Sequence, residues 1–171
     1  MTNLEKIQSN KVIKMFSEIL ERTIWARLTG GAIIDILEGR TPKDYDFIDY
    51  SQEDIDAFKK AGFMFQCETK YAITYQKDGF IVQFLKTSFS DFDFIISQSC
   101  YDFSSKKLII DETSFEHKTL IPVNFEDKES ALSCLVRLPH WRKKGYEIHD
   151  ATYLSLLETI AGKSLKNNLH S

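Results

Sequence analysis

The spacing of hydrophobic residues divides the chain into short helices and strands. Residues 4–20 carry hydrophobic side chains at steps of three and four, which predicts an amphipathic helix. The segment 44–50, DYDFIDY, begins with alternating polar and apolar residues, which predicts a half-buried strand. Between these two, we expect a strand over 23–29 and a short helix over 32–37 that ends at Gly39.

The middle of the chain is predicted to consist mostly of strands. A helix over 53–61, capped by Ser51, precedes them. Asp78-Gly79 is a typical two-residue hairpin turn between two of the strands. We expect strands over 63–75, 80–86, 89–97 and 107–110, and then helices over 129–138 and 151–161, the last one capped by Asp150 and ended by Gly162.

This order of elements predicts an α+β (mixed α/β) fold, with a mixed β-sheet flanked by helices and a short helical C-terminal appendage. We expect a main domain over 1–125 and a helical segment over 126–171 that packs on it, so that the 171 residues form a single compact unit.

Composition limits the classes of protein to which the chain can belong. No apolar run reaches the ~20 residues that span a membrane, and the N-terminus lacks the pattern of a signal peptide. The three cysteines are widely spaced, without a CxxC motif, so we expect free thiols and a cytoplasmic protein. The net charge of −3 excludes a protein that coats nucleic acid through overall positive charge, so any such contact needs a local patch.

Gly30-Gly31 lies where the predicted strand over 23–29 meets the helix that follows it. Two glycines allow the backbone to approach a bulky group closely, and the N–H groups at the start of a helix favour an anion. This arrangement suits a phosphate chain. A tight turn without a ligand is the alternative.

Asp44 and Asp46 are two residues apart on a predicted strand, so their carboxylates project from the same face. Two like charges this close are costly unless a cation lies between them, and carboxylate oxygens suit Mg²⁺. A solvated strand face is the alternative. A second acidic strand, containing Asp91 and Asp93, would add a third carboxylate if it lies beside the first, and three carboxylates can hold two metal ions.

The segment LTGGAIIDILEGRTPKDYDF resembles the signature of the DNA polymerase β-like nucleotidyltransferases, most closely the head domain of CCA-adding enzymes and bacterial poly(A) polymerases. The pattern of those heads is roughly hGGxVRDxLLGRxPxDxDh. The chain departs from it at Ile33-Ile34, where the family has a basic residue. The residues that match the pattern are Gly30, Gly31, Asp35, Leu37, Gly39, Arg40, Pro42, Asp44, Asp46 and Phe47.

The resemblance implies roles for individual residues. Gly30, Gly31 and Arg40 would bind the nucleotide, and Asp44 and Asp46 would be catalytic metal ligands. Asp93, within FSDFDFIISQ, matches the third catalytic, metal-binding carboxylate of the superfamily, and Asp91 on the same face is the alternative.

The C-terminal part contains a weaker match. Arg137-x-x-His140-Trp141 resembles the neck helix that contributes to the nucleotide pocket, although Pro139 interrupts it. The basic residues that follow, Arg142, Lys143 and Lys144, would then face the acceptor. A solvated helix end, where cations complement the helix dipole, is the alternative.

These features predict a Mg²⁺-dependent nucleotidyltransferase that binds two Mg²⁺ ions, with Mn²⁺ as a substitute. It would transfer a nucleoside monophosphate from an NTP to an acceptor hydroxyl and release pyrophosphate. The resemblance favours an RNA 3′ end, such as that of tRNA, as the acceptor. A protein or small-molecule acceptor, or a catalytically silent nucleotide-binding module on the same fold, are the alternatives.

Overall fold

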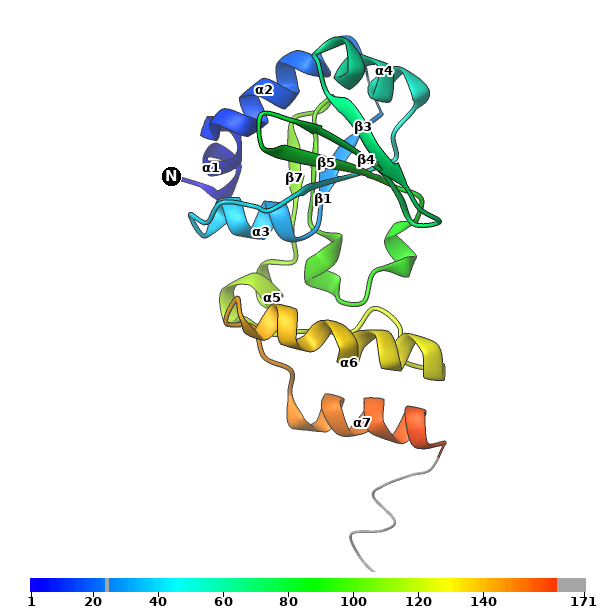
Figure 1. Cartoon of the computed structure of the whole chain (residues 1–171). Helices are drawn as coiled ribbons and strands as arrows, with labels where there is room; N and C mark the ends of the chain where they lie inside the picture. Colours follow the sequence, from blue (N-terminus) through cyan, green and yellow to red (C-terminus); the bar gives the residue numbers. More distant parts are fainter. Residues whose placement is uncertain (24, 163–171) are drawn as a thin grey trace, which may run out of the picture. The chain divides into compact units, whose positions relative to one another are not determined.

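The computed structural model describes residues 1–23 and 25–162, and the chain forms two compact units (Figure 1). The first unit contains the β-sheet and the helices around it, and the second unit is mainly helical. The first unit consists of Met1–Ser88 and Ser99–Ile109, and the second of Phe89–Gln98 and Ile110–Ser171.

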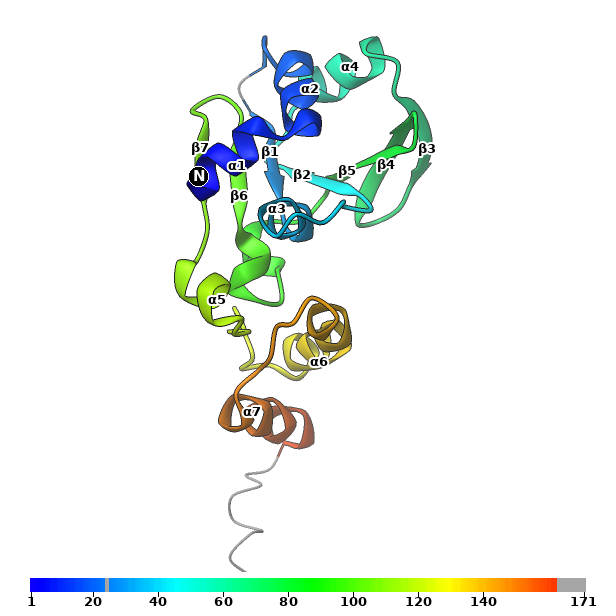
Figure 2. The same ribbon diagram turned by 90° about the vertical axis from the view of Figure 1, so that its left-hand side faces the viewer.

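The first unit is built on a seven-stranded mixed sheet in the order β3-β4-β5-β2-β1-β6-β7 (Figure 2). β2 and β5 run parallel, and every other neighbouring pair is antiparallel. The strands are β1 Arg27–Thr29, β2 Tyr45–Ile48, β3 Met64–Glu68, β4 Ala72–Lys77, β5 Phe80–Leu85, β6 Cys100–Asp102 and β7 Lys107–Ile109.

The N-terminal segment forms two helices, so the prediction of one helix over 4–20 is wrong. The chain breaks at Asn10, whose backbone is extended and whose side-chain oxygen accepts hydrogen bonds from the N–H groups of Val12 and Ile13. This is an N-terminal cap that starts a new helix without disturbing the hydrophobic period. The helices of the first unit are α1 Asn3–Ser9, α2 Lys11–Ile19, α3 Gly31–Leu37 and α4 Gln52–Lys60.

Aromatic side chains form the core between the sheet and the helices α2 and α4. Phe47 on β2 lies 5.4 Å from Phe16, 5.2 Å from Phe58 and 5.6 Å from Phe84 between ring centroids. All four rings are fully buried. Because side chains alternate along a strand, the burial of Phe47 directs Asp46 to the other face of the sheet.

The hairpin predicted around Asp78-Gly79 is confirmed, and both turn residues have positive φ angles of 50° and 83°. Such angles at both positions give the turn that matches the twist of a two-residue hairpin. The single strand predicted over 63–75 is two strands, β3 and β4. Thr69 separates them, because its hydroxyl oxygen accepts hydrogen bonds from the N–H groups of Tyr71 and Ala72.

The strand predicted over 89–97 is wrong. The chain instead makes two short 3₁₀ helices, Phe89–Asp91 and Ile95–Gln98, and the strand β6 that follows them was not predicted. The alternating apolar residues are real, since Phe94 and Ile96 are fully buried. Local turns bury them equally well, so the alternation alone could not distinguish the two structures.

The second unit joins the segment 89–98 to the C-terminal helices. The N–H of Ile95 donates to the carbonyl of Ile121 at 2.8 Å, and the N–H of Val123 donates to the carbonyl of Asp93 at 3.0 Å. The expected boundary at 125/126 therefore falls inside this unit. Its helices are α5 Glu112–His117, α6 Lys128–Arg142 and α7 Asp150–Ala161.

Helices α6 and α7 lie where they were predicted, but the end of α6 and the start of α7 differ from the prediction. α6 continues beyond the expected end at 138 and passes through Pro139. The buried side chains of Leu138 and Trp141, one on each side of the proline, keep this last turn packed. His149, rather than Asp150, precedes the first residue of α7, and Gly162 ends that helix with a φ of 63° as expected.

The described elements confirm an α+β fold with a mixed sheet and seven helices. Within the described ranges, no helix has both the length and the apolar character needed to cross a bilayer.

Candidate functional site

A glycine turn links β1 to α3 in the first unit. Gly30 has φ 74° and ψ −145°, a backbone conformation that essentially only glycine adopts. The carbonyl of Ser99 holds this turn, because it accepts hydrogen bonds from the N–H of Gly30 at 3.0 Å and from the hydroxyl of Thr29 at 2.9 Å. Gly31 is the first residue of α3. The geometry therefore requires a glycine at position 30 and fixes the start of α3.

The two aspartates predicted to bind metal lie at one end of β2. Asp44 is exposed and directly precedes the strand, and Asp46 is half-buried within it. The Oδ1 atom of Asp46 is buried. Since the two residues are two positions apart in extended chain, their side chains project toward the same side.

Strand pairing brings the glycine turn to these aspartates. Thr29, the last residue of β1, is paired with Asp46 on the antiparallel strand β2. The chain that continues from Thr29 into Gly30 and Gly31 therefore runs toward the end of β2 at which Asp44 lies. The structure thus brings the predicted phosphate-binding turn and the predicted cation ligands together within the first unit.

The neighbour of Asp46 on its other side is Gln83, which sequence reasoning missed. Asp46 and Gln83 are in register on the parallel strands β2 and β5. Gln83 is the single polar residue of β5, whose sequence is FIVQFL. That isolated polar residue was a usable signal, but only the observed pairing of β5 with β2 gives it a neighbour.

Arg40 lies in the loop that leads from α3 to Asp44, and two carboxylates hold it. Its Nε is 2.9 Å from Oδ1 of Asp35, and its Nη2 contacts Glu38. Its backbone N–H also donates to the carbonyl of Asp35 at 2.7 Å. Arg40 therefore fixes the loop after α3, and its guanidinium charge is balanced locally.

In the second unit, two of the predicted site residues pair with each other. Nε of Arg137 lies 3.4 Å from Oδ2 of Asp93. Asp93 also anchors α6 through its backbone, because its carbonyl accepts from Sγ of Cys134 at 3.4 Å. Burial, together with the Asp93 charge, raises the pKa of the Cys134 thiol to about 12, so this thiol stays protonated. Asp91, the alternative carboxylate, is exposed in a 3₁₀ helix.

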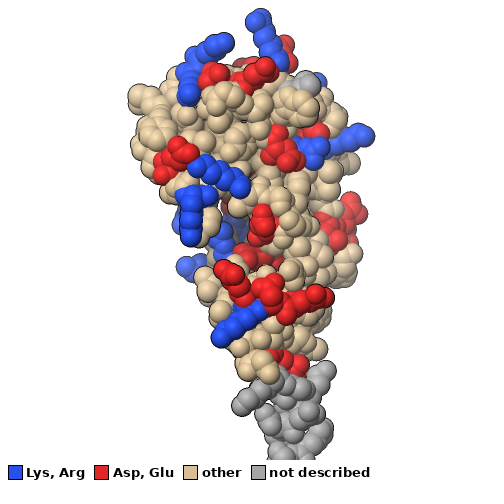
Figure 3. All heavy atoms as spheres, turned by 90° about the vertical axis from the view of Figure 1, so that its right-hand side faces the viewer, with Lys and Arg blue, Asp and Glu red and all other residues tan. Residues whose placement is uncertain are grey.

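Two of the basic residues at the end of α6, Arg142 and Lys144, have local partners. Nε of Arg142 lies 3.1 Å from Oε2 of Glu147, and Nζ of Lys144 lies 5.6 Å from the centre of the Trp141 ring. The exposed His140 ring meets Trp141 edge to face, and the exposed Lys143 ends the helix. Figure 3 shows basic and acidic side chains interspersed on one face of the molecule.

Oxygen donors dominate the site in the first unit. Two carboxylates with a neighbouring amide and hydroxyl are the donor chemistry that Mg²⁺ prefers, so the residues present fit this ion. Throughout residues 1–23 and 25–162, no three His, Cys, Asp or Glu side chains are grouped so that they could hold a metal ion. The predicted ligand Asp93 belongs to the second unit.

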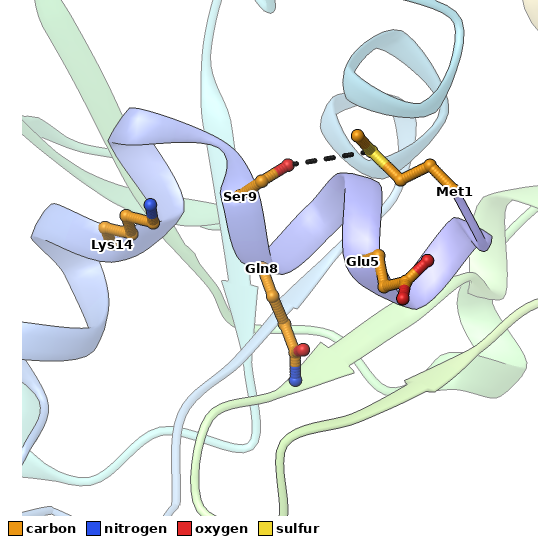
Figure 4. A pocket seen from close by; sticks show the side chains of 5 residues that line it. All are labelled: Met1, Glu5, Gln8, Ser9 and Lys14. Carbon is orange, nitrogen blue, oxygen red and sulfur yellow. Dashed lines mark hydrogen bonds between the residues drawn. The ribbon is translucent and has the colours of Figure 1, made fainter.

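A depression on the first unit lies apart from these residues. One depression of about 590 Å³ is open to solvent and is lined by Met1, Glu5, Gln8, Ser9 and Lys14 of the first two helices and the residues before them (Figure 4). It contains none of the predicted site residues. The evidence that the glycine turn and the aspartates lie together is therefore the strand register, and this depression is separate from them.

A protein family matches more than half of the chain. The family described as "Gad2: Gabija anti-defense 2 family protein" matches residues 4–119, which include the sheet and the site in the first unit. No curated protein sequence matches the chain.

Solved structures with a similar fold include CCA-adding enzymes. The Thermotoga maritima CCA-adding enzyme complexed with tRNA has a TM-score of 0.72 and 15% identity, and the match covers 96% of this chain and 46% of that one. A CCA-adding enzyme with CTP also has a TM-score of 0.72, at 16% identity, over 96% of this chain and 45% of that one. A tRNA-processing enzyme gives 0.67 at 15% identity, over 89% and 48%. The chain thus shares its fold with part of each of these enzymes and spans about half their length.

Proposed function

The chain belongs to the Gabija anti-defense 2 family, and from its fold and the geometry around Asp46 we propose that it is a Mg²⁺-dependent nucleotidyltransferase. The single observation that carries the proposal is the pairing of Thr29 with Asp46, which brings Gly30-Gly31 to the same end of the sheet as Asp44. A phosphate-binding turn beside two carboxylates is what a reaction between a triphosphate and a hydroxyl requires.

The glycine turn would bind the triphosphate. Gly30 has no side chain and a positive φ, so phosphate oxygens can approach the backbone closely there. Arg40 would act indirectly, because its contacts with Asp35 and Glu38 hold the loop that carries Asp44. The basic residue that the resemblance predicts near Ile34 is missing, and the nucleotide-binding role expected for Arg137 and His140 stays a prediction.

Asp44 and Asp46 would hold the Mg²⁺ that accompanies the NTP. When bound, the ion neutralises phosphate charge and lowers the pKa of a hydroxyl near it. The contribution of the chain is to hold two carboxylates on one side of β2 at fixed separation. This is positioning and electrostatic stabilisation, without a covalent enzyme intermediate.

The reaction exchanges a phosphoanhydride bond for a phosphate ester bond. The oxygen of the acceptor hydroxyl forms a bond to the α-phosphorus of the NTP, and the bond from that phosphorus to the oxygen bridging to the β-phosphorus breaks. The hydroxyl proton passes to solvent, and pyrophosphate leaves with the electron pair of the broken bond. The product is the acceptor carrying a nucleoside monophosphate.

Two observations point to different acceptors. The tRNA in one of the similar structures favours an RNA 3′ end, which the basic residues Arg142, Lys143 and Lys144 would contact. The family description names an anti-defence role, and the acceptor would then be a hydroxyl on a protein of the defence system. The second candidate is also consistent with the net charge of −3 and with the pairing of Arg142 to Glu147.

The proposal is tested by incubating the full chain with each α-³²P-labelled NTP, Mg²⁺, and either total RNA or a protein lysate, and then separating RNA from protein. We expect label in one of the two fractions with at least one NTP, and none when EDTA replaces Mg²⁺. Label in the RNA fraction that decreases with salt supports the RNA acceptor, and label that resists ribonuclease but not protease supports the protein acceptor. Absence of label in every fraction contradicts the proposal.

A further inference from the structure

Gln83 occupies a position beside the proposed cation site that neither the family match nor the sequence motif assigns. Asp46 has Thr29 as its partner on β1 and Gln83 as its partner on β5. Residues in register on neighbouring strands present their side chains to the same face of a sheet, with strands about 4.8 Å apart. Gln83 is therefore a direct lateral neighbour of Asp46.

The opposite face of the same two strands confirms this orientation. Phe47 and Phe84, each one residue further along, are fully buried and stack on each other with ring centroids 5.6 Å apart. Because side chains alternate along a strand, Asp46 and Gln83 project together from the other face. The amide of Gln83 and the carboxylate of Asp46 thus share one surface of the sheet.

A hydrogen bond orients the amide of Gln83. Its Nε2 donates to the hydroxyl of Thr74 at 3.5 Å, and Thr74 is its register partner on β4. Since β5 lies between β4 and β2, the nitrogen is engaged on the side away from Asp46. The carbonyl oxygen Oε1 is then the amide atom available on the side of β2, and an amide oxygen is a ligand that divalent cations accept.

We propose that Gln83 is the third protein ligand of the cation site formed by Asp44 and Asp46, and that this site binds one divalent cation rather than the two expected from the resemblance. Two carboxylates and a neutral amide oxygen carry a charge of −2, which one Mg²⁺ balances. A third carboxylate at this place would add a negative charge and attract a second ion. This inference rests on the proposed function, because it assumes that Asp44 and Asp46 bind the cation.

The test measures Mn²⁺ binding to the full chain by electron paramagnetic resonance, without any nucleotide. We expect one Mn²⁺ per wild-type chain, a loss of about tenfold in affinity for Gln83→Leu, and a gain of about tenfold for Gln83→Glu. Gln66→Glu is the matched control. It adds the same charge on the exposed edge strand β3, three strands and about 14 Å from β2, and should bind as the wild type does.

Thermal unfolding gives a second readout that does not depend on activity. Without metal, Gln83→Glu should unfold at a lower temperature than the wild type, because three carboxylates repel each other. Addition of Mg²⁺ should raise its unfolding temperature more than that of the wild type or of Gln66→Glu. An equal rise in all three proteins contradicts a ligand role for position 83.

The outcomes separate this inference from the proposed function. If Asp46→Asn loses Mn²⁺ while Gln83→Leu and Gln83→Glu bind it as the wild type does, the cation site stands and Gln83 is not a ligand. If Asp93→Asn loses affinity for Mn²⁺ and Gln83→Leu does not, the third protein ligand of the cation is Asp93. If the wild type and Asp46→Asn both fail to bind Mn²⁺, the inference and the proposed function are both overturned.

Discussion

Arg137 and Asp93 form an ion pair, with 3.4 Å between Nε and Oδ2. The family resemblance implies that Arg137 binds the nucleotide and that Asp93 binds the metal. The pair connects α6 to the segment that precedes β6, and both residues belong to the second unit. Asp93 is thus part of the contacts that hold α6 in place, whatever else it does.

A double-mutant cycle on Arg137→Ala and Asp93→Asn measures this pair directly. The Arg137 side chain is 62% exposed, so solvent screens the pair and we expect a coupling free energy below about 1 kcal/mol that decreases with salt. Urea unfolding of the four proteins checks it, with Arg142→Ala as the control that leaves Asp93 unaffected. A salt-independent coupling of several kcal/mol contradicts this view of the pair.

Substitution of Gly30 should be more damaging than substitution of a glycine in an ordinary turn. Its φ of 74° with ψ of −145° is strained for any other residue, so Gly30→Ala should lose about 1–3 kcal/mol of unfolding free energy. Gly39→Ala is the control, because its φ is also positive at 73° and a Cβ there would meet nothing within 4 Å. If urea unfolding shows that the two variants lose the same free energy of unfolding, the backbone at Gly30 is no more demanding than that at Gly39.

The three cysteines should differ sharply in reactivity. Cys67 is exposed, and Cys100 and Cys134 are buried, with burial raising the pKa of both thiols. We therefore expect a thiol reagent such as Ellman's reagent to modify one cysteine in the native chain at pH 8 and all three after unfolding in guanidinium. Cys67→Ser should abolish the native reaction. Rapid modification of that variant contradicts the burial of the other two.

The raised pKa of Cys134 also predicts a loss of stability at high pH. The thiol has a pKa of about 12 in the folded chain and an ordinary value of 9.0 in the unfolded chain. The unfolded state therefore releases this proton first, so the contribution to stability is complete below pH 9 and disappears as the pH rises toward 12. Unfolding midpoints in urea at pH 8 and pH 10.5 should fall less for Cys134→Ala than for the wild type. If the unfolding midpoint falls by the same amount in the two proteins between pH 8 and pH 10.5, the thiol does not titrate in this range.

Local sequence patterns were sufficient to predict the strand and the turn that carry the aspartates and the two glycines. The alternation in DYDFIDY predicted β2 because Phe47 is buried and Asp46 lies on the opposite face. The motif placed Gly30 at a junction of strand and helix because only a glycine tolerates that backbone. Both signals depend on residues close together in the sequence, so they can be interpreted without knowledge of the tertiary structure.

Long-range pairing explains what the sequence could not predict. The alternation around Asp93 suggested a strand beside β2, but the buried Phe94 lies between two short 3₁₀ helices, and the neighbours of β2 are β1 and β5. Nothing in the motif connects Gln83 to Asp46, since 37 positions separate them and only strand order joins them. The break at Asn10 was missed for a different reason, because the hydrophobic period continues across it.

The most direct test of the account is the rate of Mg²⁺-dependent transfer of label from an α-³²P-labelled NTP by Asp46→Asn, compared with Asp78→Asn. Both substitutions remove one negative charge, but Asp78 lies in an exposed turn with a positive φ that asparagine also adopts. We predict that Asp46→Asn loses at least about 100-fold in rate while keeping its unfolding temperature, since carboxylate ligands of the ion are needed for the reaction and not for the fold. Asp78→Asn should transfer at the wild-type rate. Wild-type transfer by a folded Asp46→Asn chain would contradict the central claim that the carboxylates of β2 carry the chemistry.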